Sequence, residues 1–105
     1  MTPHEVLIKA DELIPTKKHW FGADQICTPG SLCLAWAIEK AADDYESELA
    51  AMEALANELP PSAHYSSWSN RWTIVRYNDH HTYKTCKAKL KLAIAATAPK
   101  SEAHS

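Results

Sequence analysis

The C-terminal part of this 105-residue chain interleaves basic and aromatic side chains, a combination suited to contact with a macromolecular partner. Tryptophan, tyrosine and arginine dominate the binding energy of many protein interfaces, and cations beside aromatic rings also suit phosphates and stacked bases. Three lysines spaced along one side of a helix would steer the approach of that partner. The expected contact residues are Trp68, Arg71, Trp72, Arg76, Tyr77, Lys84, Lys87 and Lys91.

Charge is divided unevenly along the chain. Residues 1–60 hold 11 acidic and 4 basic side chains, and residues 61–105 hold 2 acidic and 7 basic ones, within a net charge of −2. This polarity indicates that the two parts face different partners or each other. Pairing of the glutamate side of one copy with the lysine side of another gives a homodimer as one alternative. An isoelectric point near 6.3 argues against a dedicated nucleic-acid domain.

Cys33 and the downstream histidines His80 and His81 have the residue types of a nucleophile and its base. Burial of Cys33 in an apolar helix explains it without catalysis. Zinc is the other chemistry these residue types allow, but the five-residue gap between Cys27 and Cys33 exceeds the usual spacing, and no second close pair exists. We therefore expect no catalytic residue, no metal and no cofactor, and a cryptic Cys33/His81 enzyme remains an alternative.

Asn78-Asp79 is a polar pair close to aromatic residues, which is compatible with a role in ligand binding. Both residue types also fold back onto nearby backbone amides and start helices. We favour the second interpretation, which predicts a turn at Asn78-Asp79 before the last helix.

The composition predicts an all-α fold, because seventeen alanines stand against two valines and two glycines. Thr2-Pro3-His4-Glu5 fits a capping box that opens a helix ending at Pro15. Leu32 to Ile38 is apolar almost all round, as in a helix buried on most faces. Residues 72–77 fit a strand or a helix, and we favour a helical or extended packed segment because a lone strand has no partner.

These elements predict one helical domain over residues 1–98 and a flexible tail over residues 99–105. The expected architecture is a small compact bundle of four to five helices around a buried central helix at about residues 31–42. A third helix should run from Tyr45 to the Pro60-Pro61 pair, and the last from about Thr82 or Thr85 to Ala96.

Several short segments together resemble a family of short actinobacterial and bacteriophage proteins. That family carries a Trp-x-x-Gly element, a Gly-x-x-Cys-Leu-x-x-Ala-Ile helix and a Trp-Asn-Asp turn before a final helix that starts with Arg-Thr. Tyr77 here replaces the usual tryptophan, and Lys84 the usual arginine. The resemblance implies architecture and a phage-type origin, but no activity, and it includes Cys33, Asn78 and Asp79 in the pattern. The matching segments are Trp20-Phe21-Gly22-Ala23, Gly30-Ser31-Leu32-Cys33-Leu34-Ala35-Trp36-Ala37-Ile38, Ile74-Val75-Arg76-Tyr77-Asn78-Asp79 and Lys84-Thr85.

The start of the chain does not fit an export signal, and no apolar run approaches the roughly 18 residues of a membrane span. Three cysteines cannot all pair, so we expect a cytoplasmic protein with reduced thiols and no membrane partner. A Cys27–Cys33 disulfide is the alternative for a secreted chain. The sequence thus predicts a small phage-type accessory protein that inhibits or modulates a host macromolecule by binding it. A host protein is the preferred partner, and nucleic acid bound by the basic C-terminal face is the alternative.

Overall fold

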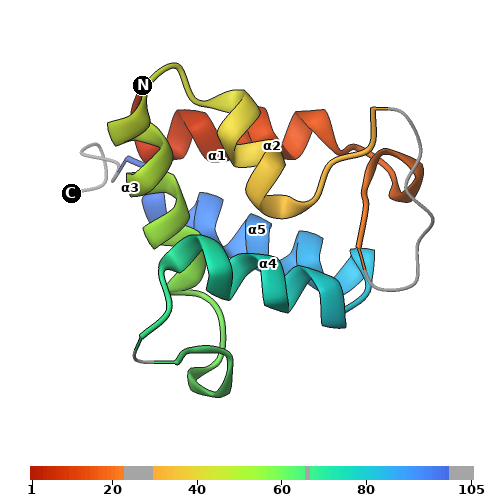
Figure 1. Cartoon of the computed structure of the whole chain (residues 1–105). Coiled ribbons are helices and arrows are strands. Elements are labelled where there is room, and N and C mark those ends of the chain that lie inside the picture. Colours follow the sequence, from red (N-terminus) through yellow and green to blue (C-terminus); the bar gives the residue numbers. More distant parts are fainter. Residues whose placement is uncertain (23–29, 66, 100–105) are drawn as a thin grey trace.

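The computed structural model describes residues 1–22, 30–65 and 67–99, and five α-helices form in this part of the chain (Figure 1). The prediction of a small all-α bundle is confirmed: the described residues hold no strand, only an isolated bridge between Trp20 and Leu32. The tail expected over residues 99–105 lies, except for Pro99, outside the described residues. The helices are α1 (Pro3–Leu13), α2 (Leu34–Ala41), α3 (Tyr45–Ala56), α4 (Asn70–His80) and α5 (Tyr83–Thr97), with 3₁₀ turns η1 (Lys17–His19) and η2 (Pro61–Ala63).

Side-chain caps explain where the helices begin. Thr2 Oγ1 accepts a hydrogen bond from Glu5 N over 3.1 Å, and Glu5 Oε1 accepts one from Thr2 N over 2.8 Å. This reciprocal pair is the predicted capping box, and it satisfies two backbone donors that α1 leaves without partners. Thr82 Oγ1 likewise accepts from Thr85 N over 3.2 Å, so α5 begins at Tyr83, close to the predicted start.

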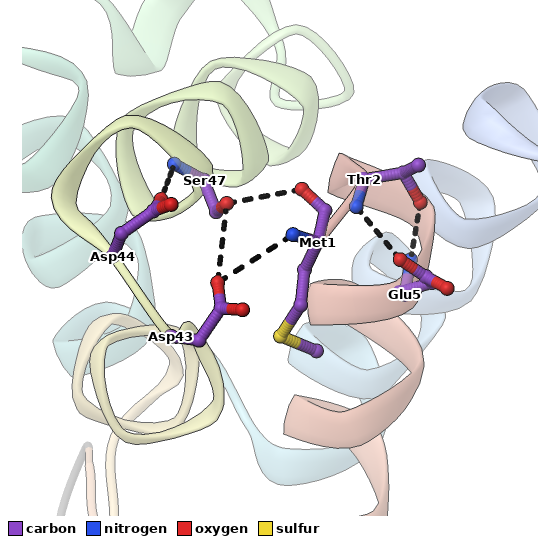
Figure 2. A network of polar contacts seen from close by, with 6 residues as sticks. All are labelled: Met1, Thr2, Glu5, Asp43, Asp44 and Ser47. Carbon is purple, nitrogen blue, oxygen red and sulfur yellow. Dashed lines mark hydrogen bonds and ion pairs between the residues drawn. The ribbon is translucent and has the colours of Figure 1, made fainter.

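The start of α3 is tied to the start of the chain (Figure 2). Asp44 caps α3 by accepting a hydrogen bond from Ser47 N over 2.7 Å. Ser47 Oγ in turn donates to the Met1 carbonyl oxygen over 3.0 Å, and the amino group of Met1 lies 3.5 Å from Asp43 Oδ1. The backbone hydrogen bond from Ser47 holds the pKa of Asp44 below its usual value. One polar cluster therefore anchors both α1 and α3.

The core lies between α1 and the helices around it. α1 packs against α2, α3 and α5, and α2 packs against α1, α3 and α4. Five of the eight α2 residues are buried, but the side chain of Trp36 is 49% exposed. The helix α2 is therefore not buried on every side. The helix begins at Leu34 instead of residue 31, because Cys33 occupies the N-cap position.

The segment over residues 72–77 is helical and belongs to α4, which continues through Asn78 and Asp79 to His80. The predicted turn at Asn78-Asp79 is therefore wrong. The turn comes after His80, where the Nδ1 atoms of His80 and His81 donate to backbone carbonyls within α4, over 2.9 and 2.8 Å respectively. These two imidazoles bond carbonyls in the last turns of α4, as histidines near the C-terminal end of a helix can do.

Candidate functional site

Three of the eight predicted contact residues, Trp68, Trp72 and Arg76, line a groove of about 660 Å³ on the outer side of α4. Trp72 and Arg76 are four positions apart in the helix and so lie on the same side of it. The exposed fractions of Trp72 and Trp68 are 62% and 38%. We call this surface the α4 groove, and its other lining residues are Ser67, Val75, Asp79 and His80.

Aromatic rings fix the position of Arg76. Its guanidinium carbon lies 5.1 Å from the ring centre of Tyr65 and 5.8 Å from that of Trp68. The two rings meet edge to face with their centres 4.5 Å apart. Each such cation–π contact stabilises by roughly 0.5–1 kcal/mol at an exposed site. The arginine is thus held against the wall of the groove.

A smaller hollow of about 150 Å³ adjoins the groove and shares Val75 and Asp79 with it. The half-exposed Trp36 of α2 lines this hollow, so a third tryptophan borders the same surface. The sequence analysis missed Trp36 as a contact residue. One signal was present, because Glu39 and Lys40 follow Trp36 at spacings of three and four and mark an outward face. The remaining residues that line the adjoining hollow are Phe21 and Cys33.

Arg71 and Tyr77 do not line the α4 groove: Arg71 bonds two neighbouring helices, and Tyr77 is buried. Arg71 Nη2 lies 2.8 Å from Glu39 Oε1 of α2, and Arg71 Nη1 lies 3.6 Å from Glu48 Oε2 of α3. Tyr77 is buried, and its ring stacks on His81 with centroids 3.7 Å apart and planes 12° from parallel. Both side chains therefore have partners within the chain.

Two of the three predicted steering lysines are bonded to α1. Lys87 forms an ion pair with Asp11, and its Nζ also donates to the carbonyl oxygens of Asp11 and Ile14 over 3.1 and 3.0 Å. Lys91 Nζ lies 2.9 Å from Asp11 Oδ2. Lys84 is exposed and has no ion pair among the described residues. The lysine stripe therefore joins α5 to α1 more than it offers charge to a partner.

The pKa values of the buried cysteines are shifted in the direction opposite to that of an activated thiol nucleophile. Cys33 and Cys86 are free, buried thiols. Burial raises the pKa of Cys33 even though its Sγ accepts a hydrogen bond from Trp36 N over 3.4 Å, and burial raises the pKa of Cys86 to about 12. His81 Nδ1 is bonded to a backbone carbonyl, and no hydrogen bond joins it to Cys33 in the described residues.

Over residues 1–22, 30–65 and 67–99, no three histidine, cysteine, aspartate or glutamate side chains gather as metal ligands would. Cys27, one of the residues considered for zinc, lies outside them. Among the same residues, none of the helices combines the length and apolarity that a bilayer crossing needs.

Asn78 is fully buried and brings the motif segments together. Its Oδ1 accepts hydrogen bonds from Trp20 Nε1 over 2.8 Å and from Leu34 N over 3.0 Å, while its Nδ2 donates to the Phe21 carbonyl over 2.9 Å. These partners fix the orientation of the amide, since two are donors and one is an acceptor. Leu34 N is the first amide of α2 and has no partner inside the helix.

Gly22 completes this arrangement, two positions after Trp20. A Cβ at Gly22 would collide with the side-chain amide of Asn78, would lie 2.6 Å from the Trp20 ring and would lie 2.9 Å from the Asn78 carbonyl oxygen. Only glycine allows this approach. The motif segments therefore meet in a buried cluster with a structural role, in which the polar atoms of Asn78 are already hydrogen-bonded.

A family model described as "Family of unknown function (DUF6197)" matches residues 1–98. Searches of curated proteins and of solved structures found no match to the chain.

Proposed function

The chain belongs to DUF6197, a family of unknown function, and we propose that it acts by binding another protein through the α4 groove. The observation that carries the proposal is the exposure of Trp72 and Trp68 beside Arg76 in one groove. A small protein has a strong energetic reason to bury tryptophan, so tryptophans exposed together on one concave surface favour a binding site. Their residue types are those that dominate protein interfaces.

The distribution of charge supports a protein partner over a nucleic acid. Arg76 and Asp79 offset each other among the residues that line the groove. Lys87 and Lys91 already bond Asp11, so they would release few counterions from a phosphate backbone. A groove with apolar walls and nearly balanced charge suits a protein surface better than a run of phosphates.

We also propose the setting in which this binding operates. The resemblance of the motif segments to short actinobacterial and bacteriophage proteins supports a phage-type accessory protein in the cytoplasm of its host. Its partner would be a host protein whose surface the groove covers, and binding would inhibit or modulate that protein by occlusion.

Capture from an actinobacterial lysate tests the proposal. Wild-type chain, Trp72→Ala and a control, Leu92→Ala, are immobilised, and retained proteins are read by mass spectrometry with and without nuclease treatment. Leu92 is 49% exposed on α5 and does not line the groove, so it matches Trp72 as a truncated exposed apolar residue. We expect wild type and Leu92→Ala to retain one protein after nuclease treatment, and Trp72→Ala not to retain it.

Two results would reject it. Retention that is unchanged by Trp72→Ala, in a variant that folds, would place the binding surface elsewhere. Loss of every partner on nuclease treatment would move the function to nucleic acid.

A further inference from the structure

We infer that the α4 groove recognises a peptide segment in which a carboxylate side chain lies close to a large apolar side chain. This inference rests on the proposed function, because it names the chemistry of the partner at the same groove. Trp72, Trp68 and Val75 would receive the apolar side chain, and the guanidinium of Arg76 would receive the carboxylate.

Arg76 is prepared for an anion that the described part of the chain does not supply. The rings of Tyr65 and Trp68 pack against its guanidinium, and no carboxylate of the described residues forms an ion pair with it. Asp79 lines the same groove, one turn further along α4, yet the two do not pair. Arg71, by contrast, already lies between two glutamates.

Contact with the two rings favours recognition of a carboxylate by Arg76. A guanidinium packed against two adjacent rings has lost part of its rotational freedom before the ligand arrives, which lowers the entropic cost of binding. Its N–H groups form a planar fork that matches the two oxygens of a carboxylate. Arg76 is half-buried, so the pair would form partly shielded from water, where it is stronger than on an open surface.

Asp79 limits how many anionic groups the ligand can place here. Asp79 lines both the groove and the adjoining hollow, whereas Arg76 lines only the groove. A second anion beside Asp79 would be repelled, which disfavours a chain of phosphates and favours a single carboxylate at the Arg76 end. Trp36 borders the hollow beyond Asp79 and offers a second apolar contact to the same segment.

Selection from a displayed library of random peptides tests the inference on the full chain. Wild type, Trp72→Ala, Arg76→Gln and the control Leu92→Ala are each used as bait. The expected peptides pair aspartate or glutamate with a nearby large apolar residue and bind wild type and Leu92→Ala alike. Trp72→Ala should lose them, and Arg76→Gln should enrich peptides without the acidic preference.

Fluorescence anisotropy with one enriched peptide separates recognition by Arg76 from a merely structural role. Replacement of the acidic peptide residue by its amide should weaken binding to wild type about tenfold, the typical loss of a charge-assisted hydrogen bond. The same replacement should cause no further loss with Arg76→Gln, since the partner group is already gone. Arg76→Lys should recover part of the affinity, because it keeps the charge without the fork.

The outcomes that would overturn the inference differ from those that would reject the proposed function. Peptides that need Trp72 but show no acidic preference would overturn the carboxylate chemistry and leave the groove as a protein-binding site. Failure to enrich any peptide that needs Trp72 would overturn the inference, while the lysate capture decides the proposed function separately. Trp72-dependent binding of a labelled oligodeoxythymidine with no such peptide would assign the groove to nucleic acid.

Discussion

The indole N–H of Trp20 donates to the side-chain oxygen of Asn78 over 2.8 Å, although 58 positions separate the two residues. The same oxygen accepts the first amide of α2 from Leu34. Because Asn78 is fully buried, none of these groups can exchange its partner for bulk water. The segment that follows α1, the start of α2 and the end of α4 therefore depend on one side-chain amide.

Asn78→Ala should lower the free energy of unfolding by roughly 3 kcal/mol. The substitution leaves two buried donors and one acceptor without partners, each at a cost of about 1–3 kcal/mol, and relaxation of the structure around them recovers part of that cost. Urea denaturation followed by circular dichroism measures the change. Asn70→Ala is the matched control, because Asn70 is exposed in the same helix and its loss should cost less than about 0.5 kcal/mol. Equal losses for the two variants would contradict the structural role of Asn78.

Gly22→Ala and Gly30→Ala test two different physical requirements for glycine, which are the lack of space for a Cβ at Gly22 and the positive φ at Gly30. At Gly22 the new methyl group meets Asn78 and Trp20, so we expect a loss of about 3 kcal/mol from overpacking. At Gly30 nothing lies within 4 Å of the new Cβ, and only the backbone angle φ of 87° opposes it, at about 1 kcal/mol. Thermal unfolding of both variants checks the order. A smaller loss at Gly22 than at Gly30 would show that the segment moves aside.

The double variant Gly22→Ala with Asn78→Ala tests whether these two positions form one unit. Removal of the Asn78 amide opens space that the Gly22→Ala methyl can occupy. The combined loss of unfolding free energy should therefore be smaller than the sum of the single losses, by roughly 0.5–3 kcal/mol. Additive losses from urea denaturation would argue that the clash lies with Trp20 and the Asn78 backbone carbonyl, and not with the Asn78 amide.

Local signals made the helices predictable, and tertiary contacts explain what the sequence did not reveal. The capping residues Thr2 and Thr82 act within four positions of their partners, so their pattern is visible in the sequence. Asn78 has the local preferences of a turn residue, but its partners come from distant segments and keep it inside α4. A single sequence contains no signal for those distances.

The candidate site shows the same division. Residue type alone identified Trp68, Trp72 and Arg76, which the structure brings together in the α4 groove. The lysine stripe looked free in the sequence because its partner, Asp11, lies 76 positions before Lys87. Charge spacing along one helix predicts a face, but only the packing of α1 against α5 decides whether that face is available.

The two buried thiols should react slowly with iodoacetamide in the folded protein. Burial raises the pKa of Cys86 to about 12 and also raises that of Cys33, so very little thiolate is present near neutral pH. In a Cys27→Ser variant at neutral pH, mass spectrometry should find that both thiols are alkylated rapidly only after urea is added. The rate in the folded state should rise with pH beyond 9, without a plateau near neutrality.

A different pH profile would support the alternative of a cryptic Cys33/His81 enzyme. Fast alkylation of Cys33 at neutral pH, lost in His81→Ala, would mean that the histidine activates the thiol. The structure opposes this outcome, because burial raises the pKa of Cys33 and no hydrogen bond joins Cys33 to His81 in the described residues.

The ion pairs of Asp11 make the docking of α1 on α5 depend on pH. Burial alone would raise the pKa of Asp11, but hydrogen bonds and charge from Lys87 and Lys91 outweigh it and lower the pKa below the usual value. A carboxyl group whose pKa is lower in the folded state stabilises that state above its unfolded pKa of about 4. This contribution is lost as the pH falls through the folded-state value.

Asp11→Asn should therefore destabilise the protein at pH 7 by roughly 1–2 kcal/mol, between the values for an exposed and a fully buried ion pair. The side chains of Asp11 and Lys87 are each only 16% exposed, which places the pair in that range. The difference between variant and wild type should shrink as urea denaturation is repeated at pH values from 5 downward, because protonation removes the same charge from the wild type. Glu12→Gln, an exposed neighbour in α1, should show neither effect. A pH-independent loss for Asp11→Asn would mean that its packing and not its charge holds α1 to α5.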